Sequence, residues 1–211
     1  MNISEFKLFL AKSAYAPKEI LEILSKDEDC DVRASVAQNL NAPKEILWML
    51  AKDKDSVVRI SVTKNKNVTK EILEILAKDK NYSVRSFVAK NLNAPKEILK
   101  ILAKDEDLDV RASVAKNSNV KEILEILAKD KTLNVRTAVV QNLNASKEIL
   151  EMLAKDKDSW VRESVAKNPK TSKKILEILA KDENYWVRES VAKNPNTSKK
   201  ILGFVNLLQK H

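Results

Sequence analysis

Apolar and polar residues follow one another along this chain in a block of about 26 residues that recurs throughout. In the block that begins at Pro95, four apolar residues have the i, i+1, i+3, i+4 spacing of one helix face: Ile98, Leu99, Ile101 and Leu102. After an acidic stretch, a narrower apolar stripe is formed by Val110, Val114 and Ala115. Each block therefore predicts two short antiparallel helices joined by polar turns, here named helix A and helix B.

A Val-Arg pair marks every block and gives the period. Seven pairs occur, at Val32-Arg33, Val58-Arg59, Val84-Arg85, Val110-Arg111, Val135-Arg136, Val161-Arg162 and Val187-Arg188. Successive arginines are separated by 26, 26, 26, 25, 26 and 26 residues. A period of this size, sustained along a chain, is typical of solenoids built from stacked helical units. The pattern predicts an all-α solenoid of about seven 26-residue, two-helix repeats with no β-sheet.

The same period predicts the domain organisation. One unit buries few aliphatic side chains, at about 1.5–3 kcal/mol each, against an ordering cost of about 1–2 kcal/mol per residue, so neighbouring units must share a core. We expect a single solenoid domain over residues 1–211, with an N-terminal cap at 1–16, repeats at 17–197 and a C-terminal capping helix at 198–211. One residue is missing near Val120, which predicts a change of superhelical pitch there or a poorly capped helix A.

Composition is consistent with an aliphatic helical core and excludes several classes of protein. The 211 residues are 44% hydrophobic and 5% aromatic, with one glycine, which leaves little room for phosphate-binding loops or β-turns. No apolar run approaches the roughly 18 residues of a membrane span, and the N-terminal residues lack a signal-peptide pattern. A single cysteine, Cys30, excludes a disulfide framework and a cysteine metal site within one chain. We expect a cytoplasmic protein with no membrane contact, no metal and no cofactor.

The repeated string resembles the leucine-rich repeat variant family, a HEAT-like group of α-solenoids. The family pattern of Val-Arg, Val-Ala and Asn-Pro occurs at Val187-Arg188, Val191-Ala192 and Asn194-Pro195. The resemblance covers essentially the whole chain and implies a right-handed superhelix in which α and 3₁₀ helices alternate. Asn-Pro is otherwise kept only at Asn168-Pro169, so the first five units depart from the pattern there. The family has no shared catalytic site to carry over, and one cysteine cannot hold the iron–sulfur module that at least one member carries.

Charged residues form two ladders. An aspartate precedes the arginine by six residues in every unit: Asp27, Asp53, Asp79, Asp105, Asp130, Asp156 and Asp182. Because a planar guanidinium makes bidentate contacts with a carboxylate, we expect an Asp–Arg ladder between adjacent repeats; a phosphate-binding track is the alternative. In most units a lysine near the end of helix A follows a glutamate by four residues, as Lys26 follows Glu22, which predicts ion pairs on an exposed face.

Polar residues are expected at both ends of helix B. Good N-cap residues precede it: Asp29, Asp55, Asn81, Asp107, Thr132, Asp158 and Asn184. An asparagine closes it in every repeat: Asn39, Asn65, Asn91, Asn117, Asn142, Asn168 and Asn194. Because asparagine tolerates the left-handed conformation common at helix ends, we expect that conformation here.

Two tryptophans on helix B are the main candidates for binding. The residue before Val-Arg and the lysine before the closing asparagine project within about 20° of each other at 100° per residue. In the last two repeats these residues are Trp160, Lys167, Trp186 and Lys193, and Tyr185 adjoins Trp186. Aromatic rings interleaved with lysines suit stacking or cation–π contact with a ligand. The alternative is that both indoles fill the contact between stacked repeats.

Two further residues attract attention. Trp48 occupies a helix A position that holds glutamate in most units, and we expect its ring to lie exposed over Lys52. Cys30 falls in the first turn of a helix B, a position that can lower a thiol pKa. The neighbouring carboxylates, Asp29 and Asp31 among them, oppose thiolate formation, so we expect an inert cysteine.

The sequence favours a binding protein over an enzyme. The one histidine is His211, and no serine or cysteine has a partner motif, so we predict no catalytic residue. HEAT-like DNA glycosylases use Trp and Asp in a groove, but their helices are longer and less regular. The preferred function is a non-catalytic scaffold whose extended face binds another protein. Nucleic-acid binding is the alternative, because residues 167–211 hold ten Lys/Arg and four Asp/Glu of a chain with net charge +9.

Overall fold

The computed structural model describes residues 2–208 and, at the C-terminal end, side chains as far as residue 207. These residues form sixteen α-helices and no strand, and the helices occur as pairs that pack consecutively. The chain divides into two compact units, Met1–Leu102 and Ala103–His211. The predicted all-α solenoid of two-helix repeats is therefore confirmed.

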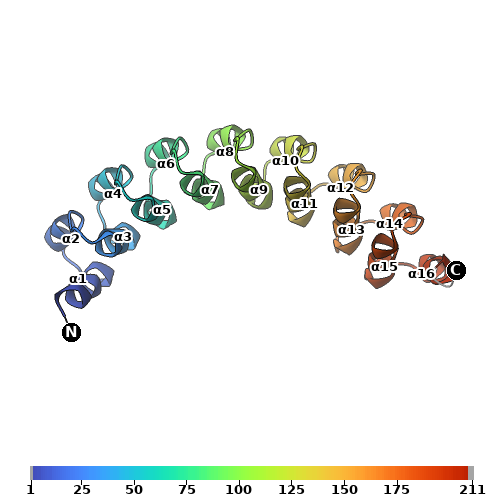
Figure 1. Ribbon diagram of the computed structural model, residues 1–211, viewed down its shortest axis with the longest axis horizontal. Helices are drawn as coiled ribbons and strands as arrows, with labels where there is room; N and C mark the ends of the chain where they lie inside the picture. The colour runs from blue at the N-terminus through green and yellow to red at the C-terminus, as the bar shows by residue number, and fades with distance from the viewer. Residues whose placement is uncertain (1, 209–211) are drawn as a thin grey trace. The chain divides into compact units, whose positions relative to one another are not determined.

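The first unit contains two layers of helices (Figure 1). One layer holds the helices A: α2 (Lys18–Leu24), α4 (Lys44–Leu50), α6 (Lys70–Leu76) and α8 (Lys96–Leu102). The other holds the helices B: α3 (Cys30–Gln38), α5 (Ser56–Lys64) and α7 (Tyr82–Lys90), each packed on the next. Before them, α1 (Ile3–Lys12) packs on α3 as a helix B would. The first helix thus takes the place of a helix B in this layer.

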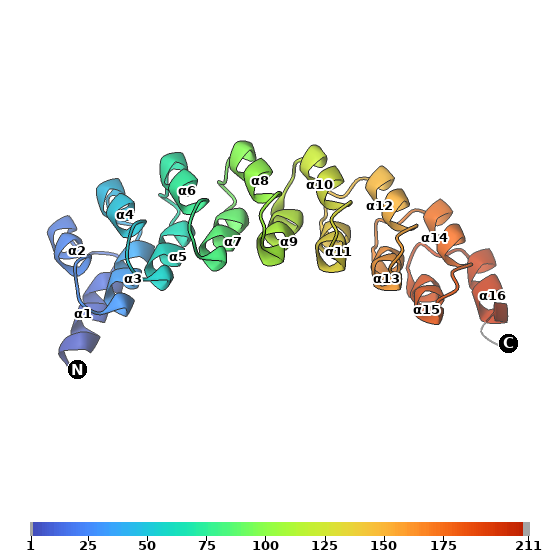
Figure 2. The ribbon, with the colours of Figure 1, turned by 45° about the horizontal axis from the view of Figure 1, so that its top comes forward.

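The second unit repeats the arrangement (Figure 2). Its helices A are α10 (Lys121–Leu127), α12 (Lys147–Leu153) and α14 (Lys173–Leu179). Its helices B are α9 (Leu108–Asn117), α11 (Leu133–Gln141), α13 (Ser159–Lys167) and α15 (Tyr185–Lys193), which pack on one another in that order. The final helix, α16 (Lys199–Leu208), packs against α15.

The core of each unit lies between the two layers. Helix A contributes isoleucine and leucine, and helix B contributes valine and alanine. In one repeat, Ile46, Leu47 and Leu50 of α4 and Val58 and Val62 of α5 are all at most 4% exposed. Burial of each such side chain contributes about 1.5–3 kcal/mol. Most of each apolar stripe seen in the sequence therefore forms the core. The exception is the third apolar position of helix A, where Ile101 is 59% exposed, so the predicted face was one residue too wide.

Both helices of each repeat are α-helical throughout residues 2–208, so the alternation of α and 3₁₀ helices implied by the family resemblance is not found. Short i→i+3 bonds occur only around helix ends, as where the Lys26 N–H donates to the Ile23 carbonyl at 3.1 Å. Helix B spans nine or ten residues, which is long enough for a regular i→i+4 ladder.

The N-caps of helix B are mostly as predicted. In six repeats the Asp or Asn side chain accepts a hydrogen bond from the backbone N–H two residues on, as Asp55 does from Val57 at 2.7 Å. Thr132 is the exception, because its side chain makes no cap bond. Its hydroxyl instead accepts from Nη2 of Arg111 at 3.3 Å.

The asparagines at the end of helix B do not adopt the left-handed conformation we expected. Asn39, Asn65 and Asn194 have φ between −67° and −73° with ψ near 130°, and no described non-glycine residue has positive φ. Their side chains serve a different purpose. Nδ2 of Asn65 donates to the carbonyls of Ala37 and Asn39 in the preceding repeat, at 2.8 and 2.9 Å. Extended backbone directs the amide across the repeat boundary, which a left-handed cap would not.

The missing residue near Val120 is absorbed locally. Helix α9 is one residue longer than the other helices B of the repeats, so Asn117 is helical and Ser118 becomes the C-cap. Asn142 of the next repeat then donates to the Ser118 carbonyl at 2.8 Å. The following helix, α10, begins at Lys121, and its N-cap residue Val120 makes no side-chain cap bond, as predicted.

Candidate functional site

The Asp–Arg ladder supports the surface on which the candidate site lies. Each arginine of five repeats holds the aspartate of the next repeat in a bidentate contact: Arg33–Asp53, Arg59–Asp79, Arg111–Asp130, Arg136–Asp156 and Arg162–Asp182. In Arg59, Nε and Nη2 lie 2.5 and 2.9 Å from the two carboxylate oxygens, and Nη1 donates to the Asp53 carbonyl at 2.7 Å. These guanidinium groups are buried and occupied. The ladder is structural, and the phosphate-binding alternative is wrong.

The pKa values of the ladder carboxylates reflect this pairing. Burial raises the pKa of Asp79, but hydrogen bonds from Arg59 and from the Asn81 backbone lower it more, so that it lies below its ordinary value. The same balance lowers the pKa of Asp53, Asp130 and Asp182. In turn, the hydrogen bond to Asp79 raises the pKa of Arg59. These four aspartates are therefore charged at neutral pH.

The two ends of the ladder differ. At the first rung Lys7, one period before Arg33, places Nζ 2.7 Å from a carboxylate oxygen of Asp27. At the last rung Arg188 donates from Nη1 to the Asp182 and Glu183 carbonyls. Its Nε is buried and has no hydrogen-bond partner. Lysine thus replaces arginine at the start, while the final arginine lacks a carboxylate on Nε.

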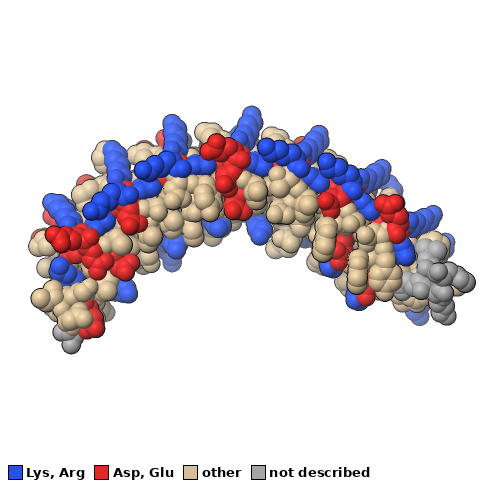
Figure 3. Space-filling model, in the orientation of Figure 1, with Lys and Arg blue, Asp and Glu red and all other residues tan. Residues whose placement is uncertain are grey.

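The predicted Glu-to-Lys pairs on helix A form with the other lysine. Helix α2 ends at Leu24, so Lys26 lies beyond it in the turn. The glutamate pairs instead with the lysine that opens its own helix: Lys18–Glu22, Lys70–Glu74 and Lys121–Glu125, with N–O distances of 3.6, 3.7 and 3.8 Å. All are exposed pairs of small energetic value. Figure 3 shows basic and acidic side chains next to one another on the face it presents in each unit.

Trp160 and Trp186 lie on the surface of the second unit. They belong to α13 and α15, which pack against each other, and their exposed fractions are 68% and 60%. The alternative that they fill the contact between stacked repeats is therefore wrong. Tyr185 meets Trp186 edge to face, with ring centroids 5.3 Å apart and planes at 79°. Three aromatic side chains are thus presented to solvent by two adjacent helices.

The lysines of the predicted Trp–Lys stripe do not contact the indole rings. Lys167 lies 2.5 Å from Glu163 and Lys193 lies 2.8 Å from Glu189, each pair one turn apart on one helix. The hydrogen bond to Glu189 raises the pKa of Lys193. Within the described residues, lysine ammonium groups lie over the rings of Trp48 and Phe87 instead. On α13 and α15 each lysine is thus paired with a glutamate of its own helix.

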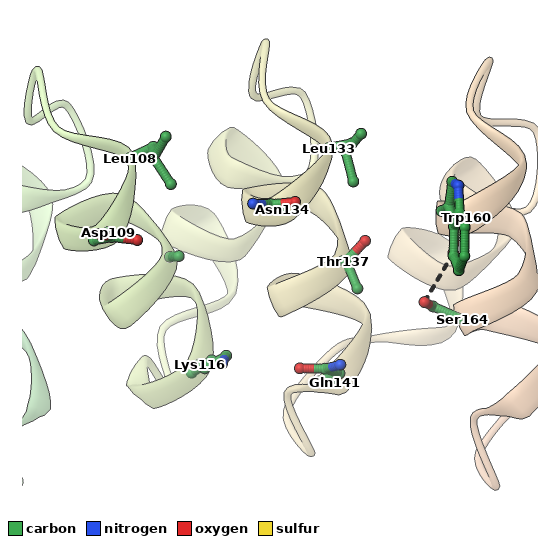
Figure 4. Close-up of a pocket in the computed structure, with 10 residues that line it drawn as sticks. Leu108, Asp109, Lys116, Leu133, Asn134, Thr137, Gln141, Trp160 and Ser164 are labelled. Carbon is green, nitrogen blue, oxygen red and sulfur yellow. Dashed lines mark hydrogen bonds between the residues drawn. The ribbon is translucent and has the colours of Figure 1, made fainter.

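A groove lies beside Trp160 and crosses α9, α11 and α13 (Figure 4). Its volume is about 560 Å³, and its lining is mixed: Leu108, Asp109, Ala112, Lys116, Leu133, Asn134, Thr137, Gln141, Trp160 and Ser164. Ser164 donates to the Trp160 carbonyl at 2.9 Å, whereas the hydroxyl oxygen of Thr137 is buried without a partner. We name this groove together with Trp160, Trp186 and Tyr185 the helix B face. Sequence reasoning found its aromatic residues but missed the groove, because its lining residues are ordinary polar and aliphatic side chains.

Trp48 lies on the other layer, on α4. It is 49% exposed, and Nζ of Lys52 stands 3.2 Å from the centroid of its ring. The predicted stacking of these two side chains is confirmed. Because the ring already contacts a lysine of its own repeat, this site is separate from the helix B face.

Cys30 lies among carboxylates at the start of α3. Burial raises the pKa of its thiol, and the carboxylates of Asp55, Asp31 and Asp29 raise it further. Ligand atoms of Asp29, Cys30 and Asp31 lie within 4.8 Å of one another, the one such group among the described residues. Asp29, however, is already the N-cap of α3 and accepts from the Asp31 N–H at 2.8 Å. The inert character expected for the cysteine agrees with these charges.

Comparisons with known proteins show the fold. No protein-family model matches the chain, and no curated protein matches it. No helix in the described part of the chain is both long and apolar enough to cross a membrane. A solved structure described as a leucine-rich repeat variant with a novel repetitive protein structural motif matches at a TM-score of 0.70 and 24% sequence identity. The match covers 93% of this chain and 84% of that one. The chain therefore has the fold of a leucine-rich repeat variant, as its repeated Val-Arg, Val-Ala and Asn-Pro strings indicated.

Proposed function

We propose that this protein is a non-catalytic scaffold that binds a peptide segment of another protein on its helix B face. The observation that carries the proposal is the exposure of Trp160, Trp186 and Tyr185 next to a groove. Large aromatic side chains dominate the energetics of protein interfaces, where they are enriched in the buried centre. Contiguous exposed apolar patches are typical of interaction surfaces.

The frame under the face is suited to binding. The face is carried by short helices whose arginines and asparagines are fixed to the neighbouring repeat, as in Arg136–Asp156 and Asn142 to the Ser118 carbonyl. A rigid surface orders few side chains on binding and so loses little entropy. The groove also offers amide groups, at Asn134 and Gln141, that can pair with a peptide backbone.

The charges of the helix B face favour a protein over a nucleic acid. The groove is lined by one acidic and one basic residue, Asp109 and Lys116. Farther along, Lys167 and Lys193 are paired with glutamates. Phosphate backbones are bound through an excess of free lysine or arginine, which this face lacks. Nucleic acid is the second candidate partner because the C-terminal repeats carry a net positive charge.

Selection of peptides from a random display library on the intact protein tests the proposal. We expect selected peptides to bind Trp160→Ala at least tenfold more weakly than the unaltered chain, and Trp186→Ala similarly. The matched control is Trp48→Ala, which removes an equally large exposed indole from the other layer and should leave affinity within twofold. Circular dichroism and thermal unfolding verify that each variant is folded.

Peptides that bind all three variants equally would contradict the proposal. Single-stranded and duplex DNA are measured in parallel at low and physiological salt. A nucleic acid would be the better candidate if no peptide is selected and DNA binds tightly at low salt. That DNA binding should then be lost when the salt is raised and be weaker in Trp160→Ala.

A further inference from the structure

Three departures from the repeated sequence meet in one pocket of the first unit. Phe87 stands where the other repeats have a small residue: Ser35, Ser61, Ser113, Ala138, Ser164 and Ser190. Lys66 stands where five other repeats have leucine or proline: Leu40, Leu92, Leu143, Pro169 and Pro195. Thr63 stands where most repeats have alanine: Ala37, Ala89, Ala115, Ala166 and Ala192. All three line a cavity of about 560 Å³ at the ends of α5 and α7.

The electrostatics of this cavity, here named the Phe87 pocket, favour an anion. Its lining includes Lys64, Lys66 and Lys90 and no acidic residue. Two helix C-termini, those of α5 and α7, contribute roughly half a negative charge each. The balance is a net positive charge of about two. No comparable excess lines the groove of the helix B face, where one acidic and one basic residue balance.

The ring of Phe87 contacts two of these lysines. Nζ of Lys64 and Nζ of Lys90 each lie 4.7 Å from its centroid, although the two lysines belong to different repeats. Cation–π attraction keeps the ammonium groups near the ring. The remaining apolar surface comes from Leu92, which is 89% exposed at the rim, and the amide of Asn93 supplies a hydrogen-bonding group. The amide of Asn91 is used within the protein, because it donates to the Thr63 carbonyl and accepts from the Asn93 N–H, both at 2.7 Å.

We propose that the Phe87 pocket binds a small organic phosphate. The phosphate group lies between the ammonium groups of Lys64, Lys66 and Lys90, since lysine binds phosphate as a point charge. The apolar or aromatic body of the ligand packs against Phe87 and Leu92. A cavity of several hundred cubic ångströms with apolar walls and a few polar groups is the usual form of a small-molecule site. The pocket lies in the first unit, so this site is independent of the peptide-binding proposal.

Adenosine monophosphate is the probe, with adenosine and inorganic phosphate as its two halves. Backbone amide shifts identify the binding residues, and calorimetry gives the dissociation constants. We expect shifts centred on residues 63–66 and 87–93, and at least tenfold weaker binding of either half than of the whole probe. Equal affinity for inorganic phosphate would contradict the proposal, as would shifts scattered over lysines of both units.

Two substitutions restore the residues that other repeats use, so both are expected to preserve the fold. Phe87→Ser and Lys66→Leu should each raise the dissociation constant of adenosine monophosphate at least tenfold. The control is Lys12→Gln on α1, where the equivalent positions Gln38 and Gln141 show that glutamine is accommodated; affinity should stay within twofold. Unchanged affinity in Phe87→Ser overturns the proposal. A magnetisation-transfer contact between the Phe87 ring and the adenine protons provides a readout in the unaltered protein, and its absence at saturation also overturns it.

Discussion

Arg136 donates from Nε to one carboxylate oxygen of Asp156 at 2.6 Å and from Nη2 to the other at 2.9 Å, across the boundary between two repeats. Both side chains are less than a tenth exposed. A third contact, from Nη1 to the Asp130 carbonyl at 2.8 Å, ties the same guanidinium to its own repeat. One side chain thus connects three segments of the chain, and the 26-residue period repeats this connection.

Removal of Arg136 should destabilise the protein more than removal of Arg188. Arg136→Ala leaves Asp156 buried and unpaired, which costs about 3–5 kcal/mol. Arg188→Ala removes a guanidinium whose Nε already lacks a partner and strands no carboxylate, so its cost should be less than half as large. Urea unfolding of the two variants measures the difference. Equal losses would show that the ladder pairing contributes little beyond the local carbonyl contacts.

Acid should weaken the protein through the ladder carboxylates. The pKa of Asp53, Asp79, Asp130 and Asp182 lies below the ordinary value, so their contribution is fully present above that value, at about pH 4, and is lost as pH falls through the folded pKa. The free energy of unfolding should therefore be constant near neutrality and decline below about pH 4. Urea titrations between pH 7 and 2 measure it. In an Arg59→Met/Asp79→Leu double variant the acid loss should be smaller, and an unchanged loss would contradict the assignment.

The buried asparagines should be as important as the arginines. Asn65 is 1% exposed and satisfies two carbonyls of the preceding repeat. Asn65→Ala leaves both carbonyls without a donor, at about 1–3 kcal/mol for each unsatisfied buried group. Exposed Asn134 on α11 is the control, and Asn134→Ala should change stability by less than about 0.5 kcal/mol. Thermal unfolding distinguishes the two, and an equally small effect of Asn65→Ala would contradict the inter-repeat role.

A cap can be restored where the deleted residue leaves none. Helix α10 has Val120 as its N-cap residue, whereas the N-cap side chains of Ser146 and Ser172 each accept from the third N–H of their helix at 3.4 Å. Val120→Ser should therefore raise the free energy of unfolding by about 0.5–1 kcal/mol. The reverse change, Ser146→Val, should lower it by a similar amount. An unchanged free energy of unfolding in both variants would mean that the serine caps of these helices do not contribute to stability.

The sequence predicted the parts of this structure that depend on spacing. The fixed six-residue spacing of aspartate and arginine, as in Asp53 and Arg59, predicted the ladder because a guanidinium and a carboxylate pair in a bidentate contact. The apolar stripe of helix A predicted the buried face at Ile98, Leu99 and Leu102. The prediction was wrong for the backbone conformation at the end of helix B, because asparagine suits more than one conformation there. Asn65 could have ended its helix in a left-handed turn or bonded across the boundary, and nothing local distinguishes these outcomes.

The surface was harder to predict than the core. Projection on a helical wheel placed Trp160 and Lys167 on one face, but it could not show that Lys167 forms an ion pair with Glu163. The Phe87 pocket was missed for a related reason. Its residues come from two repeats, and each looks unremarkable until the departures at Lys66 and Phe87 are seen to meet in space.

Quenching of single tryptophans by iodide tests the proposed peptide site most directly. Variants that retain one indole each, with phenylalanine at the other two positions, report separately on Trp48, Trp160 and Trp186. When a selected peptide is bound, we predict that the quenching constant falls at least threefold for Trp160 and Trp186 and stays unchanged for Trp48. The opposite result would contradict the assignment of binding to the helix B face. In that case the bound peptide lowers the quenching constant of Trp48 and leaves those of Trp160 and Trp186 unchanged.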